Sequence, residues 1–161
     1  MNDENTHIGV FIMMFLLMLF LMVSAGCGNQ NVEKAFAMDT EFKPYIDTIE
    51  RLYTDYTGDI TEINEGIMLA DLSDNQAGRC QWEVGNKRNR VILINRKVWD
   101  KETENYRLKL LLHELGHCKW ELAHDPDKNT IMYKKVIYYG EDNDLIFESM
   151  LTVFFNKVKG K

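Results

Sequence analysis

The stretch LKLLLHELGHCKWEL, residues 108–122, decides the fold and the chemistry that this sequence predicts. Its leucines recur with helical spacing and form an apolar stripe, which predicts an amphipathic helix. Asp100 or Thr103 is the expected N-cap of this helix. His113 and His117 are one helical turn apart, so they lie on the same face. The stretch therefore predicts two imidazoles side by side on a helix.

Two neutral imidazoles at this spacing can bind one Zn²⁺ ion together. Glu114 adjoins the first histidine, and its carboxylate can reach a metal-bound water rather than the metal, as a general base does. A catalytic zinc keeps three protein ligands and one open position. His124 is the first candidate for the third ligand. Three of the chain's four histidines fall between positions 113 and 124, which favours a metal site over a helix with two surface histidines.

Two other residues are alternative third ligands. Asp125 adjoins His124 and has a carboxylate that zinc accepts. Glu148 lies further along, in the last expected helix, without a supporting motif around it. The sequence leaves the choice between these residues open.

The flanking sequence predicts one α+β domain. Pro44 suits the first turn of a helix that ends at Gly58, and apolar residues between them recur every 3.6 residues. Short strands are expected within residues 60–72 and at 78–84 and 91–94. A last helix is expected at residues 142–157. The order helix, strands, helix, loop, helix fits an α+β fold.

The run Val91-Ile92-Leu93-Ile94 is the most β-prone in the chain, and it has two possible places in the sheet. A continuous aliphatic run is typical of an interior strand that is buried on both faces. The alternative is an edge strand before the metal-binding helix, which could pair with an extended peptide.

The N-terminal sequence predicts export. Residues 8–23 are an unbroken apolar or glycine run, followed by Ser24-Ala25-Gly26-Cys27. Small residues before a cysteine resemble a bacterial lipobox. That resemblance implies cleavage before Cys27, a lipid on its thiol, and location in the periplasm or on the cell surface. The alternative is an uncleaved membrane anchor. The expected organisation is a signal or anchor at 1–26, a tether at 27–40 and a domain at 41–161.

Lipidation of Cys27 would limit which cysteines can form a disulfide. If Cys27 is lipidated, Cys80 and Cys118 are the two that remain, and an exported protein can pair them in a disulfide. Two separate buried thiols are the alternative, because proximity cannot be read from sequence.

Composition narrows the class of protein. With 161 residues, the chain allows one domain plus a leader. A hydrophobic content of 45% excludes a wholly disordered chain. A formal net charge of −6 argues against a sequence-independent nucleic-acid binder, which needs a clustered cationic face. We expect a monomer whose partners are a peptide or protein substrate and the membrane.

The motif HELGH, a third histidine after a short bend, and Asn129-Thr130-Ile131-Met132-Tyr133 together resemble a metzincin metallopeptidase of the matrixin branch. Met132 lies eight positions after His124, an interval that resembles that of matrixins. The resemblance implies a small zincin-like domain: a twisted, mainly antiparallel or mixed sheet with an active-site helix and a C-terminal helix.

On this resemblance the chain is a zinc endopeptidase with one catalytic Zn²⁺. His113, His117 and His124 would hold the ion, and Glu114 would be the general base for a zinc-activated water. Met132 would be the methionine of the Met-turn, although a methionine is more often core filler. Tyr133 would stabilise an oxyanion, or only pack.

One departure from the family pattern concerns the bend. The family's glycine is Trp120 here, and this chain has one residue more before the third histidine. A longer bend must therefore bring His124 to the metal. The alternative function is a non-catalytic, zinc-stabilised surface binding module or an inactive peptidase relative.

Overall fold

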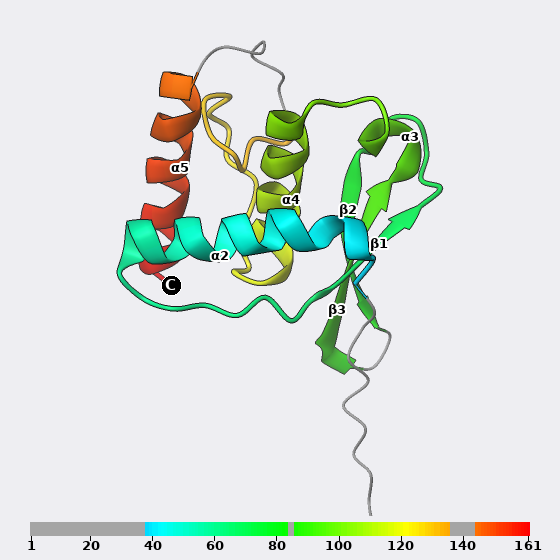
Figure 1. Cartoon of the computed structure of the whole chain (residues 1–161), viewed down its shortest axis with the longest axis horizontal. Helices are drawn as coiled ribbons and strands as arrows, with labels where there is room; N and C mark the ends of the chain where they lie inside the picture. The colour runs from blue at the N-terminus through cyan, green and yellow to red at the C-terminus, as the bar shows by residue number, and fades with distance from the viewer. Residues whose placement is uncertain (1–37, 84–85, 136–143) are drawn as a thin grey trace, which may run out of the picture. The chain divides into compact units, whose positions relative to one another are not determined.

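The computed structural model describes residues 38–83, 86–135 and 144–161 of the chain (Figure 1). In chain order its elements are η1 (Thr40–Phe42), α2 (Lys43–Thr57), β1 (Gly66–Ala70), β2 (Gly78–Glu83), β3 (Asn86–Asn95), α3 (Arg96–Trp99), α4 (Glu104–Cys118) and α5 (Asp144–Lys159). The expected α+β class is confirmed.

The sheet is small and mixed, with the strand order β1-β3-β2. Strand β3 runs parallel to β1, with Gly66 opposite Val91, and antiparallel to β2, with Gly78 opposite Ile94. Ile92 and Ile94 on β3 are fully buried. The run 91–94 is therefore an interior strand, and β2 is the edge strand that lies against α4.

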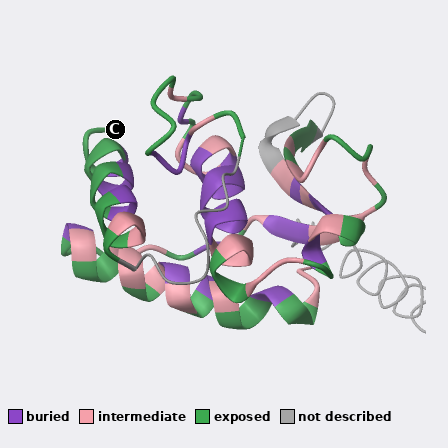
Figure 2. Ribbon diagram, turned by 90° about the horizontal axis from the view of Figure 1, so that it is seen from above, coloured by how far each residue is buried: buried purple, intermediate pink, exposed green. Residues whose placement is uncertain are grey.

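Helix α4 is the centre of the domain, because all of its residues from Lys109 to Gly116 are buried (Figure 2). Thr103 is its N-cap and accepts a hydrogen bond from the amide of Tyr106 at 3.4 Å. Of the two expected caps, the structure therefore uses Thr103. This helix is buried all round rather than on one stripe, since elements pack on several of its sides.

The other two long helices agree closely with the sequence. Pro44 lies in the first turn of α2, and Gly58 ends it in the left-handed conformation at φ 79°. Helix α5 contributes a set of buried apolar residues to the core: Met150, Leu151, Phe154, Phe155 and Val158. The first residues expected for this last helix, 142 and 143, lie outside the described part of the chain.

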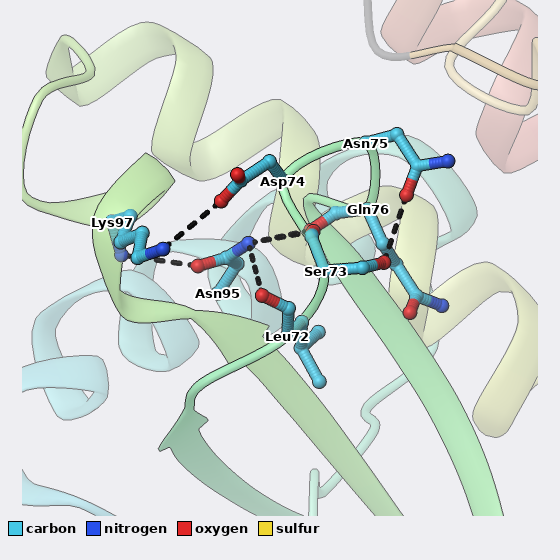
Figure 3. Close-up of polar contacts among 7 residues, drawn as sticks. All are labelled: Leu72, Ser73, Asp74, Asn75, Gln76, Asn95 and Lys97. Atoms are coloured by element: carbon cyan, nitrogen blue, oxygen red, sulfur yellow. Dashed lines mark hydrogen bonds and ion pairs between the residues drawn. The ribbon is translucent and has the colours of Figure 1, made fainter.

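The loop between β1 and β2 is held by one buried amide (Figure 3). Asn95 is fully buried, and its Nδ2 donates to the carbonyls of Leu72 at 3.5 Å, Ser73 at 3.2 Å and Gln76 at 2.9 Å. Its Oδ1 accepts from the amide of Lys97 at 3.1 Å and so caps α3. One side chain therefore fixes the path by which the chain enters β2.

The expected leader, the lipidation of Cys27 and most of the tether lie outside the described residues. In the part of the chain that the structure describes, no helix has the length and apolar character needed to cross a membrane.

Candidate metal centre

The three histidines of the sequence motif converge in space. His113 and His117 lie on α4, with 3.2 Å between their Nε2 atoms. His124, in the loop after α4, places its Nε2 3.1 Å from that of His117. Their ligand atoms all lie within 4.8 Å of one another, and among the described residues this is the group that could hold a metal ion. The predicted grouping of these three side chains is confirmed.

Backbone carbonyls set the tautomer of the two helical histidines. Nδ1 of His113 lies 2.7 Å from the carbonyl oxygen of Ile131, and Nδ1 of His117 lies 2.7 Å from that of Leu122. A carbonyl oxygen only accepts, so each Nδ1 carries the proton and donates. Each Nε2 therefore presents a lone pair to the shared centre, as metal-binding histidines do when their second nitrogen is held.

The donor set fits a divalent cation of the zinc type. Lone pairs about 3 Å apart repel one another unless a proton or cation lies between them. A tetrahedral zinc with bonds of about 2.05 Å to nitrogen places its ligands roughly 3.3 Å apart, close to the 3.1 and 3.2 Å observed. Three imidazoles leave one position for a non-protein ligand, as in catalytic rather than structural zinc sites.

The environment also keeps the imidazoles in the neutral form that binds metals. Burial lowers the pKa of His113 to about 4, with smaller contributions from the neighbouring imidazoles. Burial, followed by the charge of His117, lowers the pKa of His124 as well. Both rings are therefore available as ligands near neutral pH.

Glu114 lies between α4 and the edge strand and is 5% exposed. Its carboxyl group contacts Gly78 and receives a backbone hydrogen bond from Cys80. Burial raises its pKa to about 7, although that hydrogen bond acts in the opposite direction. It does not belong to the group of candidate ligand atoms. A buried carboxyl group beside the ligands, but not among them, is the arrangement expected of a general base.

Met132 is buried beneath the helical ligands. It is 1% exposed, and its sulfur packs against Gly116, the residue before His117. Tyr133 follows it and is half-buried. In the described part of the chain, the Tyr133 side chain has no hydrogen bond or ring contact with the imidazoles, so its suggested oxyanion role stays a prediction.

The alternative third ligands are engaged elsewhere. The Asp125 carboxylate pairs with Lys157 and accepts from the amide of Asp127 at 2.8 Å. Glu148 on α5 accepts a hydrogen bond from the hydroxyl of Tyr56 on α2. Of the three candidates, only His124 lies with the helical histidines.

The remaining cysteines form a disulfide. Cys80 on β2 and Cys118, the last residue of α4, are joined with a Cα–Cα distance of 5.4 Å. The pairing that the sequence left open is thus present, and it ties the edge strand to the end of the helix that carries His113 and His117.

The sequence did not reveal the backbone carbonyls that hold the histidines, or the residue at which the bend turns. The carbonyls of Ile131 and Leu122 carry no residue signature, so no pattern could reveal them. Trp120, where the family has glycine, stacks on Tyr53 and packs against Phe154. The left-handed residue of the bend is Glu121, at φ 52°. A glycine would have marked the turning residue. Without one, the sequence indicates a longer bend but not the residue at which the chain turns.

No protein-family model matches the sequence, and no curated protein and no solved structure matches it significantly. The likeness to metzincins is thus a likeness of motif. A function for this chain rests on the geometry and chemistry of its own residues.

Proposed function

We infer that the protein is a zinc-dependent endopeptidase with a small zincin-like domain, exported and held at the membrane by its N-terminus. The observation that carries this proposal is the convergence of three Nε2 lone pairs, two of them oriented by backbone carbonyls. His113, His117 and His124 would hold the ion. Zn²⁺ supplies Lewis-acid chemistry when bound: it lowers the pKa of a coordinated water and polarises a substrate carbonyl.

Glu114 is the proposed general base. Its carboxylate takes a proton from the attacking water and passes it to the leaving amine. Burial between α4 and β2 keeps its pKa near neutrality, where a carboxyl group can both accept and return a proton. A purely structural metal site has no use for such a group beside its first ligand.

The edge strand β2 is the proposed place for an extended substrate. One side of β2 pairs with β3, and in the described residues no strand pairs with its other side. An extended peptide could add to this edge by backbone hydrogen bonds. The carboxyl group of Glu114 lies against the first residue of the same strand, Gly78, which relates the proposed base to the proposed substrate path.

Metal content tests the first step of this proposal. The purified full-length protein is expected to bind about one zinc per chain. His124→Ala should greatly weaken binding, whereas Asp125→Asn should retain it, because the Asp125 carboxylate is paired with Lys157. Full zinc retention in folded His124→Ala would contradict the three-histidine site.

Proteolysis tests the second step. Cleavage of fluorescently labelled casein by the zinc-loaded protein should fall by at least about 100-fold in Glu114→Gln, which keeps the shape of the side chain. Zinc content should be unchanged in this variant. A zinc-loaded wild-type protein that cleaves no peptide would instead favour the non-catalytic binding module.

A further inference from the structure

We propose that Arg90 is a positioning residue for the third metal ligand, because it holds the glycine-free bend that carries the chain from His117 to His124. This inference rests on the metal site of the proposed function. It concerns a residue of β3 that neither binds the metal nor belongs to the motif.

The backbone after His124 is held by a hydrogen bond of 2.7 Å from the amide of Asp125 to the carbonyl of Met132, whereas the backbone before His124 depends on the bend. His124 lies beyond Cys118, the last residue of α4, and its side chain is exposed. In the described part of the chain, the Nδ1 atoms of the other two ligands are held by carbonyls, whereas His124 has no hydrogen bond of this kind. Its position therefore depends on the path of the backbone that leads to it.

That path turns at Glu121. The amide of Leu122 donates to the carbonyl of Gly116 at 2.8 Å, which closes the end of the helix. This closure needs a left-handed residue, and Glu121 supplies it at φ 52°. It is the one non-glycine residue with positive φ in the described ranges. Side chains with a Cβ atom disfavour this conformation, so the bend requires external support.

Arg90 contacts both the end of α4 and the residue at which the chain turns. Its guanidinium donates to the carbonyl of Cys118 and pairs with the carboxylate of Glu121. The Arg90 side chain is 17% exposed, and its guanidinium lies 4.6 Å from the centre of the Trp82 ring. The planar guanidinium group, with its several N–H donors, suits this double contact. Its positive charge is also favourable at the C-terminal end of a helix.

Arg107 offers a matched control. Its guanidinium also donates to a backbone carbonyl, that of Trp99 at 2.8 Å, and also pairs with a carboxylate, that of Glu104. It too lies over a tryptophan ring, at 5.2 Å. Arg107 is near the start of α4 and contacts neither the bend nor the histidines. A loss of general stability should affect both arginine variants, whereas a loss of ligand positioning should affect only one.

The experiment is a titration of the full-length protein with Co²⁺, followed by its visible absorption and by competition with a chelator. We expect Arg90→Met to lower metal affinity by about 10- to 100-fold, the usual effect of losing an outer contact of a metal site. The spectrum should change as one nitrogen ligand is weakened. Arg107→Met should bind within a factor of about 3 of wild type.

The decisive part of the experiment is a second substitution that should rescue metal affinity. Glycine adopts the left-handed conformation without support, so Glu121→Gly added to Arg90→Met should restore most of the lost affinity. Wild-type affinity in folded Arg90→Met, an equal loss in Arg107→Met, or no recovery in the double variant would overturn the proposal. If Arg90→Met does not fold, Arg90→Lys keeps the charge without the fork and is expected to show an intermediate loss. Wild-type affinity in folded Arg90→Lys would overturn the proposal as well.

The outcomes separate this inference from the proposed function. If the wild-type protein binds Co²⁺ but cleaves no peptide, the peptidase proposal fails, and the role of Arg90 still stands or falls by the variants. If the wild-type chain binds no metal, both the peptidase proposal and the proposed role of Arg90 fail.

Discussion

Gly78 of β2 and Glu114 of α4 are so close that a Cβ atom on Gly78 would lie 2.6 Å from Oε1 of Glu114. The same atom would lie 2.8 Å from Cγ and 2.9 Å from Cδ of the glutamate. Any larger residue at position 78 would therefore displace the carboxyl group of Glu114, the proposed base. Because the contact joins the edge strand to the helix that carries His113 and His117, it relates the sheet directly to the candidate metal site.

Gly78→Ala should displace the carboxyl group of Glu114 while leaving the metal site intact. We expect kcat for peptide cleavage to fall by about 10- to 100-fold, since small displacements of a catalytic group have effects of that size. Metal affinity should change little, because no imidazole contacts Gly78. Arg51→Ala, at an exposed position on α2 and outside the proposed substrate edge, is the control and should retain activity. Wild-type kcat in Gly78→Ala would contradict this account of the glycine.

Gly116→Ala tests the packing of Met132 beneath the ligands. A Cβ atom on Gly116 would lie 2.4 Å from the Met132 sulfur and 3.2 Å from Cε2 of Phe154. Helix propensity alone would favour alanine by about 1 kcal/mol. Overpacking is expected to outweigh this and to lower the free energy of unfolding by about 1–3 kcal/mol. Urea unfolding measures the change.

The double variant Gly116→Ala/Met132→Ala separates the two effects. Removing the long methionine side chain should relieve the overlap, so the effects of the two changes should not add. Additive losses would mean that the two residues do not interact, against the contact observed.

Opening the Cys80–Cys118 disulfide should destabilise the domain. The bridge closes a loop with a sequence separation of 38 residues, for which chain entropy gives about 4 kcal/mol. We expect Cys80→Ala/Cys118→Ala to lower the midpoint of urea unfolding by a corresponding amount. Reductant should shift the wild-type midpoint in the same direction and leave the variant unaffected. A variant midpoint equal to that of the oxidised wild type would refute the prediction.

Asn95→Ala should destabilise the loop that leads into β2. The buried amide of Asn95 donates to three backbone carbonyls, and its removal leaves all three without that donor. A loss of about 2–4 kcal/mol in the free energy of unfolding is expected. Asn95→Asp should be at least as harmful, because a carboxylate cannot donate. Lys97→Ala, which removes an exposed pair with Asp74, should change stability by less than about 1 kcal/mol.

Much of the candidate site is local in origin. His113 and His117 face the same way because four residues make about one helical turn, and this holds wherever the helix packs. The N-cap at Thr103, the left-handed end of α2 at Gly58 and the strand at 91–94 likewise follow from neighbouring residues. These features were predictable because the interactions that produce them span only a few positions.

The tertiary structure decided what depends on distant parts of the chain. His124, rather than Asp125 or Glu148, lies with the two helical histidines. The carboxylates of Asp125 and Glu148 are engaged instead by Lys157 and Tyr56, which lie on two other helices. Strands β1 and β2 became the two edges of the sheet because β3 lies between them and pairs with both.

The bend between His117 and His124 shows most clearly how local sequence and long-range contacts each contribute to the structure. The sequence alone indicates a longer bend without glycine before His124, but it does not indicate which residue turns. In the folded chain the turn lies at Glu121, which Arg90 of β3 contacts across 31 positions of sequence. Short-range spacing determined which side chains face one way on a helix. Long-range contacts, which supply the free energy for an unfavourable backbone conformation, determined which side chains meet.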